Sequence, residues 1–486
     1  MNKTRLNTII LVSLFTLSLF LISQTLLNTN IDLFSSISLS EQDESEEIIL
    51  SQIIVPKEIL INYSEKTHTI LNIDNEYGLW NKAKDVLENT FSVQDISINL
   101  IEENEYIDAN NKKSIKFEFA DKIPMDVFLN SFNIDVDIVT FQNINSIKEI
   151  YIGLDEENNI ILSDDESHIE LKNIEYSKKI FSNALEQIKT SQSFVNYWPS
   201  DVSLGINSNI YIPYRLPHEK KDIIVENDIK VKESTESNKN IDKIAEGFFD
   251  KDLSYLRKVV DNTGVVIYMY NQHTGLLIYP NGLVEYSNTL NKKQGKRDIN
   301  ESLNSLAEFI TKRDRLPENS YISDIEAIES EDDSKGYRFT INYSINGKSV
   351  YINDKTKEDG SLINALVAEV YGDKVTSYKR FYRDIIVSEN STYGEERINP
   401  EDVIEKNIAK IKESFNDEQN TIASNMQTKF YKDIIASIKD ISLGYYDKSS
   451  SYYKTPLIES WIIDIKNNRY IFDSSSGNLI DIKSLE

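Results

Sequence analysis

The segment MNKTRLNTIILVSLFTLSLFLISQTLLNTN (residues 1–30) decides how the rest of the chain is interpreted. Lys3 and Arg5 precede a run that carries no charge until Asp32, and most of that run is Leu, Ile, Val or Phe. As an α-helix, residues 6–27 would be about 33 Å long, which is enough to cross a hydrocarbon core of about 30 Å. The segment therefore predicts a transmembrane helix over residues 6–27.

The alternative for this segment is a secretory signal peptide, which has a shorter apolar core followed by a cleavage site between small residues. Here the apolar run ends in QTLLN (24–28), no Ala occurs near it, and the chain has no Cys that could carry a lipid. We therefore expect an uncleaved, single-pass anchor. Because Lys3 and Arg5 favour the cytoplasmic side, residues 1–5 are expected in the cytoplasm and the chain after the helix outside it.

One face of the expected helix carries small and hydroxyl-bearing residues. This transmembrane stripe consists of Ile9, Ser13, Thr16, Phe20, Ser23, Gln24 and Leu27. Small side chains let a second helix approach closely, and Gln24 can hydrogen-bond across such a contact. Alternatively, the hydroxyls bond back to the carbonyls of their own helix, and Ser18 and Thr25, which lie off the stripe, favour that interpretation. The stripe is the candidate contact with a partner helix in the membrane.

Composition excludes one class of partner and bounds the size of the core. The 486 residues include 53 Lys and Arg against 79 Asp and Glu, a net charge of −26, which excludes nucleic-acid binding. The length is sufficient for two or three domains outside the membrane. The absence of Cys fits an extracytoplasmic protein that does not rely on disulfides. Abundant Ile, Asn, Lys and Ser, few Gly and Pro, and 27 Tyr suggest an AT-rich genome, which together with the single anchor points to a Gram-positive bacterium.

The chain after the anchor divides by composition into a stalk and three folded parts. Residues 28–50 are polar and acidic, as in a solvated stalk. From residue 51 on, helical and strand periodicities alternate, and prolines and charges between 190 and 240 mark a break. We expect an α+β fold of antiparallel sheets with packed helices. Its expected domains are 51–195, 196–390 and 391–486, the last two forming a weak repeat of a helix followed by a meander.

Several elements can be assigned to residues. Alternation of apolar and polar residues predicts strands, and a period near 3.6 predicts amphipathic helices. The expected strands include 58–63, 96–101, 114–119, 265–270, 275–279 and 283–286, and the expected helices include 75–91, 176–189, 241–249, 299–313 and 400–415. The charged segment KVKESTESNKN (230–240) is expected to be an exposed loop.

No catalytic, cofactor-binding or metal-ligating set emerges from the motifs. The four histidines, His68, His168, His218 and His273, have no metal-ligand spacing, and each is expected at the surface or in a turn. The acidic segment DEENNIILSDDE (155–166) lacks the sixth-position Gly of an EF-hand loop and is expected to form a hairpin. The acidic turn at 329–333 is a weaker candidate for a cation. We therefore expect no enzyme activity, cofactor or metal.

The aromatic residues leave a second possibility open. Trp198, Tyr211, Tyr214 and the tyrosines between 268 and 286 could line a surface that binds glycan or peptide. Tyrosine is also an ordinary strand residue, and that interpretation is preferred. A binding module for wall glycan or peptides remains an alternative, and so does a membrane-anchored wall hydrolase, since sequence alone does not exclude a pair of carboxylates.

Three stretches carry a resemblance to a known family. These are IPMDVFLNSF (123–132), FFDKDLSYLRKV (248–259) and TGLLIYPNGLVEYSN (274–288). With the short N-terminus before a single anchor, the chain resembles the YycH family, extracytoplasmic regulators of the essential cell-wall sensor histidine kinase of low-GC Gram-positive bacteria. The resemblance implies non-enzymatic control of that kinase, largely through contacts between membrane helices. It also implies a YycI-like companion regulator and no catalytic residues.

Overall fold

The computed structural model describes residues 46–485 except residues 74, 93–95, 132–140, 142–143, 156–157, 192–193, 207–208, 217–218, 228, 230–234, 250–251, 291–292, 314–315, 354–361, 394–396, 416–426 and 450–453. Among the helices of the described part, none is long and apolar enough to cross a membrane. The expected transmembrane helix 6–27, its stripe, and His218 lie outside the described residues.

The first half of the described chain forms a nine-stranded antiparallel sheet, in the order β3-β7-β6-β5-β4-β1-β2-β8-β9. Its strands are β1 (Glu58–Ser64), β2 (Thr67–Leu71), β3 (Ser97–Ile101), β4 (Ser114–Pro124), β5 (Ser146–Gly153), β6 (Ile160–Ser163), β7 (His168–Lys172), β8 (Tyr197–Pro199) and β9 (Tyr211–Pro213). The helices within this part are α3 (Leu79–Phe91), α4 (Glu103–Asn110), α5 (Met125–Ser131), α6 (Lys179–Thr190) and α7 (Ser200–Ser203). The expected strands 58–63, 96–101 and 114–119 are confirmed as β1, β3 and β4.

Alternation along β4 gives this sheet two different faces. Ile115, Phe117 and Phe119 point to the face that packs in a core with α3, α5 and α6. Lys116 and Glu118 therefore point to the opposite face, part of which is covered by α4. That second face holds the site described below.

A second sheet of fourteen strands runs through the rest of the chain. Its strands are β11 (Arg257–Val260), β12 (Val266–Tyr270), β13 (Thr274–Ile278), β14 (Leu283–Asn288), β15 (Ser320–Glu329), β16 (Lys335–Ile345), β17 (Lys348–Asn353), β18 (Leu362–Ile363), β19 (Leu366–Tyr371), β20 (Lys374–Phe381), β22 (Ile438–Asp447), β24 (Ile458–Ile465), β25 (Asn468–Asp473) and β26 (Leu479–Ser484). All the pairings are antiparallel except β17 with β22, which is parallel and carries the sheet across residue 390. A three-stranded sheet combines β10 (Glu219–Glu226), β21 (Asp384–Tyr393) and β23 (Lys454–Pro456).

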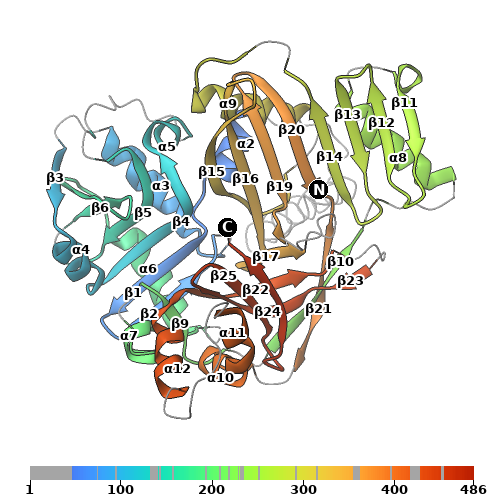
Figure 1. Cartoon of the computed structure of the whole chain (residues 1–486). Coiled ribbons are helices and arrows are strands. Elements are labelled where there is room, and N and C mark those ends of the chain that lie inside the picture. The colour runs from blue at the N-terminus through green and yellow to red at the C-terminus, as the bar shows by residue number, and fades with distance from the viewer. Residues whose placement is uncertain are drawn as a thin grey trace, which may run out of the picture. The chain divides into compact units, whose positions relative to one another are not determined.

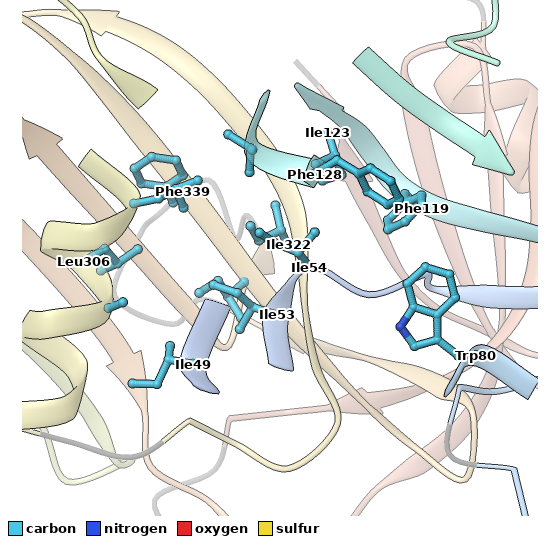
Figure 2. Close-up of a cluster of buried hydrophobic side chains, with 14 of the residues drawn as sticks. Ile49, Ile53, Ile54, Trp80, Phe119, Ile123, Phe128, Leu306, Ile322 and Phe339 are labelled. Carbon is cyan, nitrogen blue, oxygen red and sulfur yellow. The ribbon is translucent and has the colours of Figure 1, made fainter. Parts of the chain in front are cut away.

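The remaining helices are α2 (Glu46–Ile53), α8 (Thr235–Phe248), η2 (Leu253–Tyr255), α9 (Ile299–Arg313), α10 (Pro400–Lys406), α11 (Ile408–Phe415) and α12 (Gln427–Ala436). Figure 1 shows α2 among α9, β15 and β16, near the first sheet. Ile49 and Ile53 of α2 are fully buried, and Figure 2 shows them near Ile322 of β15, with Leu306 and Phe339 in the same core. The helix α2 thus begins within the segment 28–50 expected to form the stalk, and it is packed rather than solvated.

The helices at the end of the chain cover the last strands. Trp461 of β24 shares a core with Val403 and Ile404 of α10, Ile411 of α11 and Ile434 of α12. The same core includes Ile210 and Ile212, at the edge of the first sheet. The two sheets are therefore joined by apolar packing at this point as well as around α2.

The expected α+β class with antiparallel sheets is confirmed, and the differences are local. The helix α9 has the expected bounds, and the three expected strands between 265 and 286 are confirmed as the antiparallel β12, β13 and β14. The expected helix 400–415 is two helices, because Asn407 leaves helical geometry and its side chain bonds to the carbonyls of Val403 and Gly477. The expectation of a loop through residue 240 is wrong for 235–240, which open α8. The three domain boundaries and the internal repeat stay predictions.

Candidate functional site

The register of the first sheet places three carboxylates in a row. Glu58 of β1 lies directly opposite Glu118 of β4, and Glu118 lies directly opposite Glu149 of β5. Side chains directly opposite each other in antiparallel strands share a face and are about 5 Å apart at Cβ, so like charges there are destabilising. This carboxylate row (Glu58, Glu118 and Glu149) needs compensation from its surroundings.

Lys116 supplies most of that compensation. It lies two residues before Glu118 on the same face of β4, and its side chain is 1% exposed. Its Nζ is 2.7 Å from Oε1 of Glu149 and 3.8 Å from Oε2 of Glu118. Tyr106 of α4 donates a hydrogen bond to Glu149, and the Asn209 amide donates another over 3.3 Å.

The protonation of the row follows from this asymmetry. Burial alone would raise the pKa of Glu149, but the charge of Lys116 and the hydrogen bonds from Lys116 and Tyr106 lower it. Burial raises the pKa of Glu118 to about 7; Lys116 acts against this shift, and Glu58 and Glu149 add to it. Burial also opposes the charge of Lys116, yet Glu149 and Glu118 hold its pKa above the ordinary lysine range. Glu149 and Lys116 therefore form a charged pair, whereas the pKa of Glu118 lies at about 7.

Two members of the carboxylate row, Glu58 and Glu118, line a cavity of about 240 Å³, which we name the inter-sheet cavity. Its walls come from β1, β2, β4, β8 and β9 of the first sheet, the turn between β16 and β17, and β22 of the second sheet. The charged residues that line it are Lys57, Glu58, Glu118, Lys348 and Asp440. Of these, Lys348 is already paired with Glu459.

A tight turn closes one wall of the inter-sheet cavity. Asn346 and Gly347 both have positive φ, 48° and 74°, as a two-residue hairpin turn requires. A Cβ added at Gly347 would lie 2.4 Å from Cβ of Asn72 in the first sheet. Glycine at this position lets the turn of one sheet approach the backbone of the other.

The strand pair β8–β9 separates the inter-sheet cavity from a second concavity. Tyr197 pairs with Pro213, and Tyr211 pairs with Pro199, so these residues share one face; Tyr197, Tyr211 and Pro213 line the inter-sheet cavity. Trp198 pairs with Ile212 on the other face, where both line a hollow of about 220 Å³. We name this hollow the aromatic pocket.

The aromatic pocket combines a half-buried Trp198, an exposed Tyr214 and polar groups. The rings of Trp198 and Tyr214 are stacked, with centroids 4.1 Å apart and an interplanar angle of 21°. Tyr214 is 48% exposed and Val202 is 61% exposed. Asn399 and Glu401, at the start of α10, also line the pocket. Exposed aromatic and apolar residues that are grouped together mark interaction surfaces more often than apolar residues scattered singly over a surface.

The structure places the aromatic candidates from the sequence in different environments. Trp198 and Tyr214 meet in the aromatic pocket, whereas Tyr211 faces the inter-sheet cavity. Tyr268 and Tyr286 are core residues, so they belong to no exposed aromatic surface. Within the described residues, no group of three His, Asp or Glu is arranged to hold a metal ion.

Two histidines correct the expectation that all four lie at the surface or in turns. His68 is 2% exposed, with Nδ1 2.8 Å from Oδ1 of Asn62, and burial lowers its pKa. His168 is 4% exposed, and its Nε2 is 2.7 Å from Oε2 of Glu103. The ring of His68 bonds within its own β1–β2 hairpin, whereas the ring of His168 reaches Glu103, which is 65 residues away. His273 is exposed in the turn between β12 and β13, as expected.

The sequence pattern does not single out the carboxylate row. The stretch IKFEF (115–119) predicts a half-buried strand with Lys116 and Glu118 on the polar side. What makes these residues a site is their burial, which depends on α4 and on strands distant in sequence. The one sequence signal is that two opposite charges alternate with large apolar residues inside a strand.

These features define an α+β protein whose two large, mainly antiparallel sheets meet at a charged cavity. No family profile matches the chain, and no curated protein matches it. Among solved structures, YycH from Bacillus subtilis aligns with 90% of this chain and 97% of its own, with a TM-score of 0.53 and 14% identity. The chain has the YycH-like fold.

Two further structures align with part of the chain. An uncharacterized protein from Eubacterium rectale ATCC 33656 is 12% identical over 62% of this chain and 99% of its own, with a TM-score of 0.35. The YpeB C-terminal domain of Bacillus megaterium is 12% identical over 52% of this chain and 98% of its own, with a TM-score of 0.21. Neither likeness is close enough to carry an argument about this protein.

Proposed function

We propose that this protein is a non-enzymatic, membrane-anchored, extracytoplasmic regulator of a sensor histidine kinase that controls cell-wall homeostasis. The observation that supports the proposal most is the YycH-like fold, which extends over 90% of the chain. The apolar segment 6–27 with Lys3 and Arg5 before it supports the anchor and its orientation. The proposed partners are the kinase itself and a YycI-like companion regulator.

The proposed mechanism is a shift between two states of the kinase. A partner that binds one state more tightly by about 1.4 kcal/mol changes the ratio of the two states tenfold. Contacts of the transmembrane stripe with the kinase helices, assisted by ectodomain contacts, would supply that difference. Such control needs no bond-making chemistry in the ectodomain, and its direction, activation or inhibition, is a matter for measurement.

The experiment is affinity purification of the full chain from native membranes, followed by identification of its partners. The proposal expects a sensor histidine kinase among the stoichiometric partners, and expects deletion of the chain to change the kinase's phosphorylation in cells. An unchanged phosphorylation level after deletion, with no kinase in the purified complex, would contradict it.

A second candidate function rests on the aromatic pocket. A sugar ring or a proline can pack against the Trp198–Tyr214 stack, while Asn399 and Glu401 offer hydrogen-bonding groups beside it. A wall-glycan or peptide-binding module would therefore use this surface. Trp198→Ala should abolish retention of the protein on purified cell wall if the module binds there, whereas Tyr255→Ala, which removes a 73% exposed tyrosine elsewhere, should not.

A further inference from the structure

The inter-sheet cavity contains charges of both signs that attract one another without a direct ion pair. Lys57, Glu58 and Asp440 line it, and each is half-buried. The charges of Asp440 and Glu58 outweigh the effect of burial and raise the pKa of Lys57, so the ammonium is present at neutral pH. Among the described residues, none forms an ion pair or side-chain hydrogen bond with these three side chains. The carboxylates are therefore near enough to attract Lys57 but do not contact it.

A ligand that pairs directly with these half-buried charges would replace hydration that burial removes. A charged group withdrawn from water loses hydration that only close pairing or hydrogen bonding replaces. A purely cationic ligand would pair with the carboxylates but be repelled by Lys57. A purely anionic ligand would pair with Lys57 but meet Glu58, Glu118 and Asp440. A ligand with one charge of each sign satisfies both walls at once.

The size of the cavity limits that ligand. Its volume of about 240 Å³ is below the roughly 300 Å³ at which pockets for drug-sized ligands begin, which favours a smaller molecule. Hydrogen-bonding groups are also available, because the hydroxyls of Tyr197 and Tyr211 and the amide of Asn72 belong to lining residues.

We propose that the inter-sheet cavity binds a small zwitterion, a free amino acid or a very short peptide, with its carboxylate on Lys57 and its ammonium on Glu58 and Asp440. The ligand would then bridge the two sheets, because Lys57 and Glu58 belong to the first sheet region and Asp440 to β22 of the second. The proposal does not depend on the kinase partner, and the binding test below stands whether or not that partner is confirmed.

The first test compares ligands on the unchanged protein. Calorimetric titration of the full chain with L-alanine and with L-alanyl-L-alanine should show saturable binding of at least one of them at or below ~10 mM. N-acetyl-L-alanine, which lacks the ammonium, and L-alaninamide, which lacks the carboxylate, should each bind at least about tenfold more weakly. Tighter binding of L-alanine would identify the ligand as a free amino acid, and tighter binding of L-alanyl-L-alanine would identify it as a short peptide. Absence of saturable binding by both, or equal binding of a blocked analogue, would overturn the proposal.

The second test changes the protein. Lys57→Met, which keeps a long unbranched side chain without the charge, and Asp440→Asn, which keeps the shape of the side chain, should each weaken binding of the better zwitterion at least about tenfold. Lys179→Met and Asp108→Asn are matched controls on exposed residues of α6 and α4, and they should leave binding unchanged. The thermal unfolding midpoint of each variant is measured to confirm that it folds. If a variant fails to fold, the ligand comparison on the unchanged chain decides whether the cavity binds a zwitterion. Unaltered affinity in folded Lys57→Met and Asp440→Asn would refute the site.

Discussion

At the scale of single residues, Glu118 shows how a strand register sets a protonation equilibrium. The groups that face it are Lys116 on its own strand, Glu58 on β1, and Glu149 and Lys148 on β5. Its side chain is still 29% exposed, so water moderates the penalty of charging it. Burial nevertheless raises the pKa of this carboxyl, because Lys116 offsets only part of the penalty: its Nζ is 3.8 Å from Glu118 and bonds more closely to Glu149.

This arrangement predicts a loss of stability as pH rises. The pKa of Glu118 is raised from 4.5 to about 7 in the folded chain, so the folded state binds more protons than the unfolded state between these values. The free energy of unfolding should therefore fall by about 1–2 kcal/mol from pH 5 to pH 8 through this group. Urea unfolding of Glu118→Gln should lack that decrease.

Glu175→Gln, at an exposed carboxyl between β7 and α6, is the control and should keep the pH dependence of the unaltered chain. If Glu118→Gln and the unaltered chain follow the same curve, Glu118 is charged in the folded protein throughout this range, and the pKa assignment is incorrect.

Gly347 gives a second prediction at this scale. Gly347→Ala introduces a Cβ at a φ of +74° and places it 2.4 Å from Cβ of Asn72, so we expect a loss of about 2–4 kcal/mol in unfolding free energy. Gly205→Ala is the matched control, because Gly205 has a φ of +70° but no atom within 4 Å of an added Cβ. It should lose only about 1 kcal/mol, from backbone strain. Equal losses in the two variants would show that the two sheets do not meet closely at Asn72.

The environment of a single residue was predictable only where it depends on its neighbours in the sequence. Alternation identifies β4, and the Asn346–Gly347 pair is a common sequence for a two-residue hairpin turn. The burial of Lys116 was not predictable, because its partner Glu149 is 33 residues away and the helix α4 that covers the pair comes from another segment. The same holds for His168, whose stacking on Tyr106 depends on tertiary contact, with ring centroids 4.2 Å apart.

At the scale of elements, α2 depends on its surroundings. A helix of eight residues is not stable alone in water, because the cost of starting a helix exceeds what so few turns return. Ile49 and Ile53 lie one turn apart and are fully buried in a core shared with α9, β15 and α5. This packing shows that the last residues of the expected stalk, from Glu46 on, belong to the folded part of the chain.

The α2 contacts predict a stability effect with a clear control. Ile49→Ala and Ile53→Ala each leave a cavity in the core and should lower the unfolding free energy by about 2–4 kcal/mol. Gln52→Ala changes an exposed residue of the same helix and should alter it by less than about 0.5 kcal/mol. Denaturant unfolding measures all three. Small effects of the isoleucine variants would show that α2 is only loosely attached.

The boundaries of a helix were predictable where the charges at its ends and its apolar period agree. Charged residues near both ends of α9 agree with its apolar period, and its bounds follow from sequence. The helix α3 starts at Leu79, four residues after the expected start, because Gly78 before it has a φ of 56°. The interruption between α10 and α11 was missed because the side chain of Asn407 bonds to Gly477, which is 70 residues away.

At the scale of the whole molecule, long-range links join the sheets in ways that no local pattern encodes. The parallel pairing of β17 with β22 makes one sheet from segments on either side of residue 390. Glu459 of β24 is 1% exposed and is bonded by Arg397 and by Lys348 of β17, whose charges outweigh its burial and lower its pKa to about 2. Local periodicity therefore predicts the α+β class, but neither the strand order nor the cavity between the sheets.

Regulation of a membrane kinase would require a link from this ectodomain to the membrane, and the transmembrane stripe is the part of the sequence that can provide it. In hydrocarbon, apolar side chains gain little by leaving lipid for another helix, so close packing and interhelical hydrogen bonds must provide the preference. Ser13, Thr16, Ser23 and Gln24 can provide both, with Phe20 and Leu27 filling the space between them. Each hydrogen bond contributes only about 0.6 kcal/mol, so several must act together to change a signalling equilibrium tenfold.

Replacing Ser13, Thr16, Ser23 and Gln24 together by Leu should therefore keep the chain in the membrane while it weakens association with the kinase and alters kinase phosphorylation about tenfold. The control set replaces Leu14, Ser18 and Leu21, on the opposite side of the expected helix, by other apolar residues, and it should have little effect. Co-purification from membranes and kinase phosphorylation in cells are the two measurements. If both sets behave alike, or if the chain without residues 1–30 regulates equally well, control resides in the ectodomain, because only the contacts of the folded part remain to carry it.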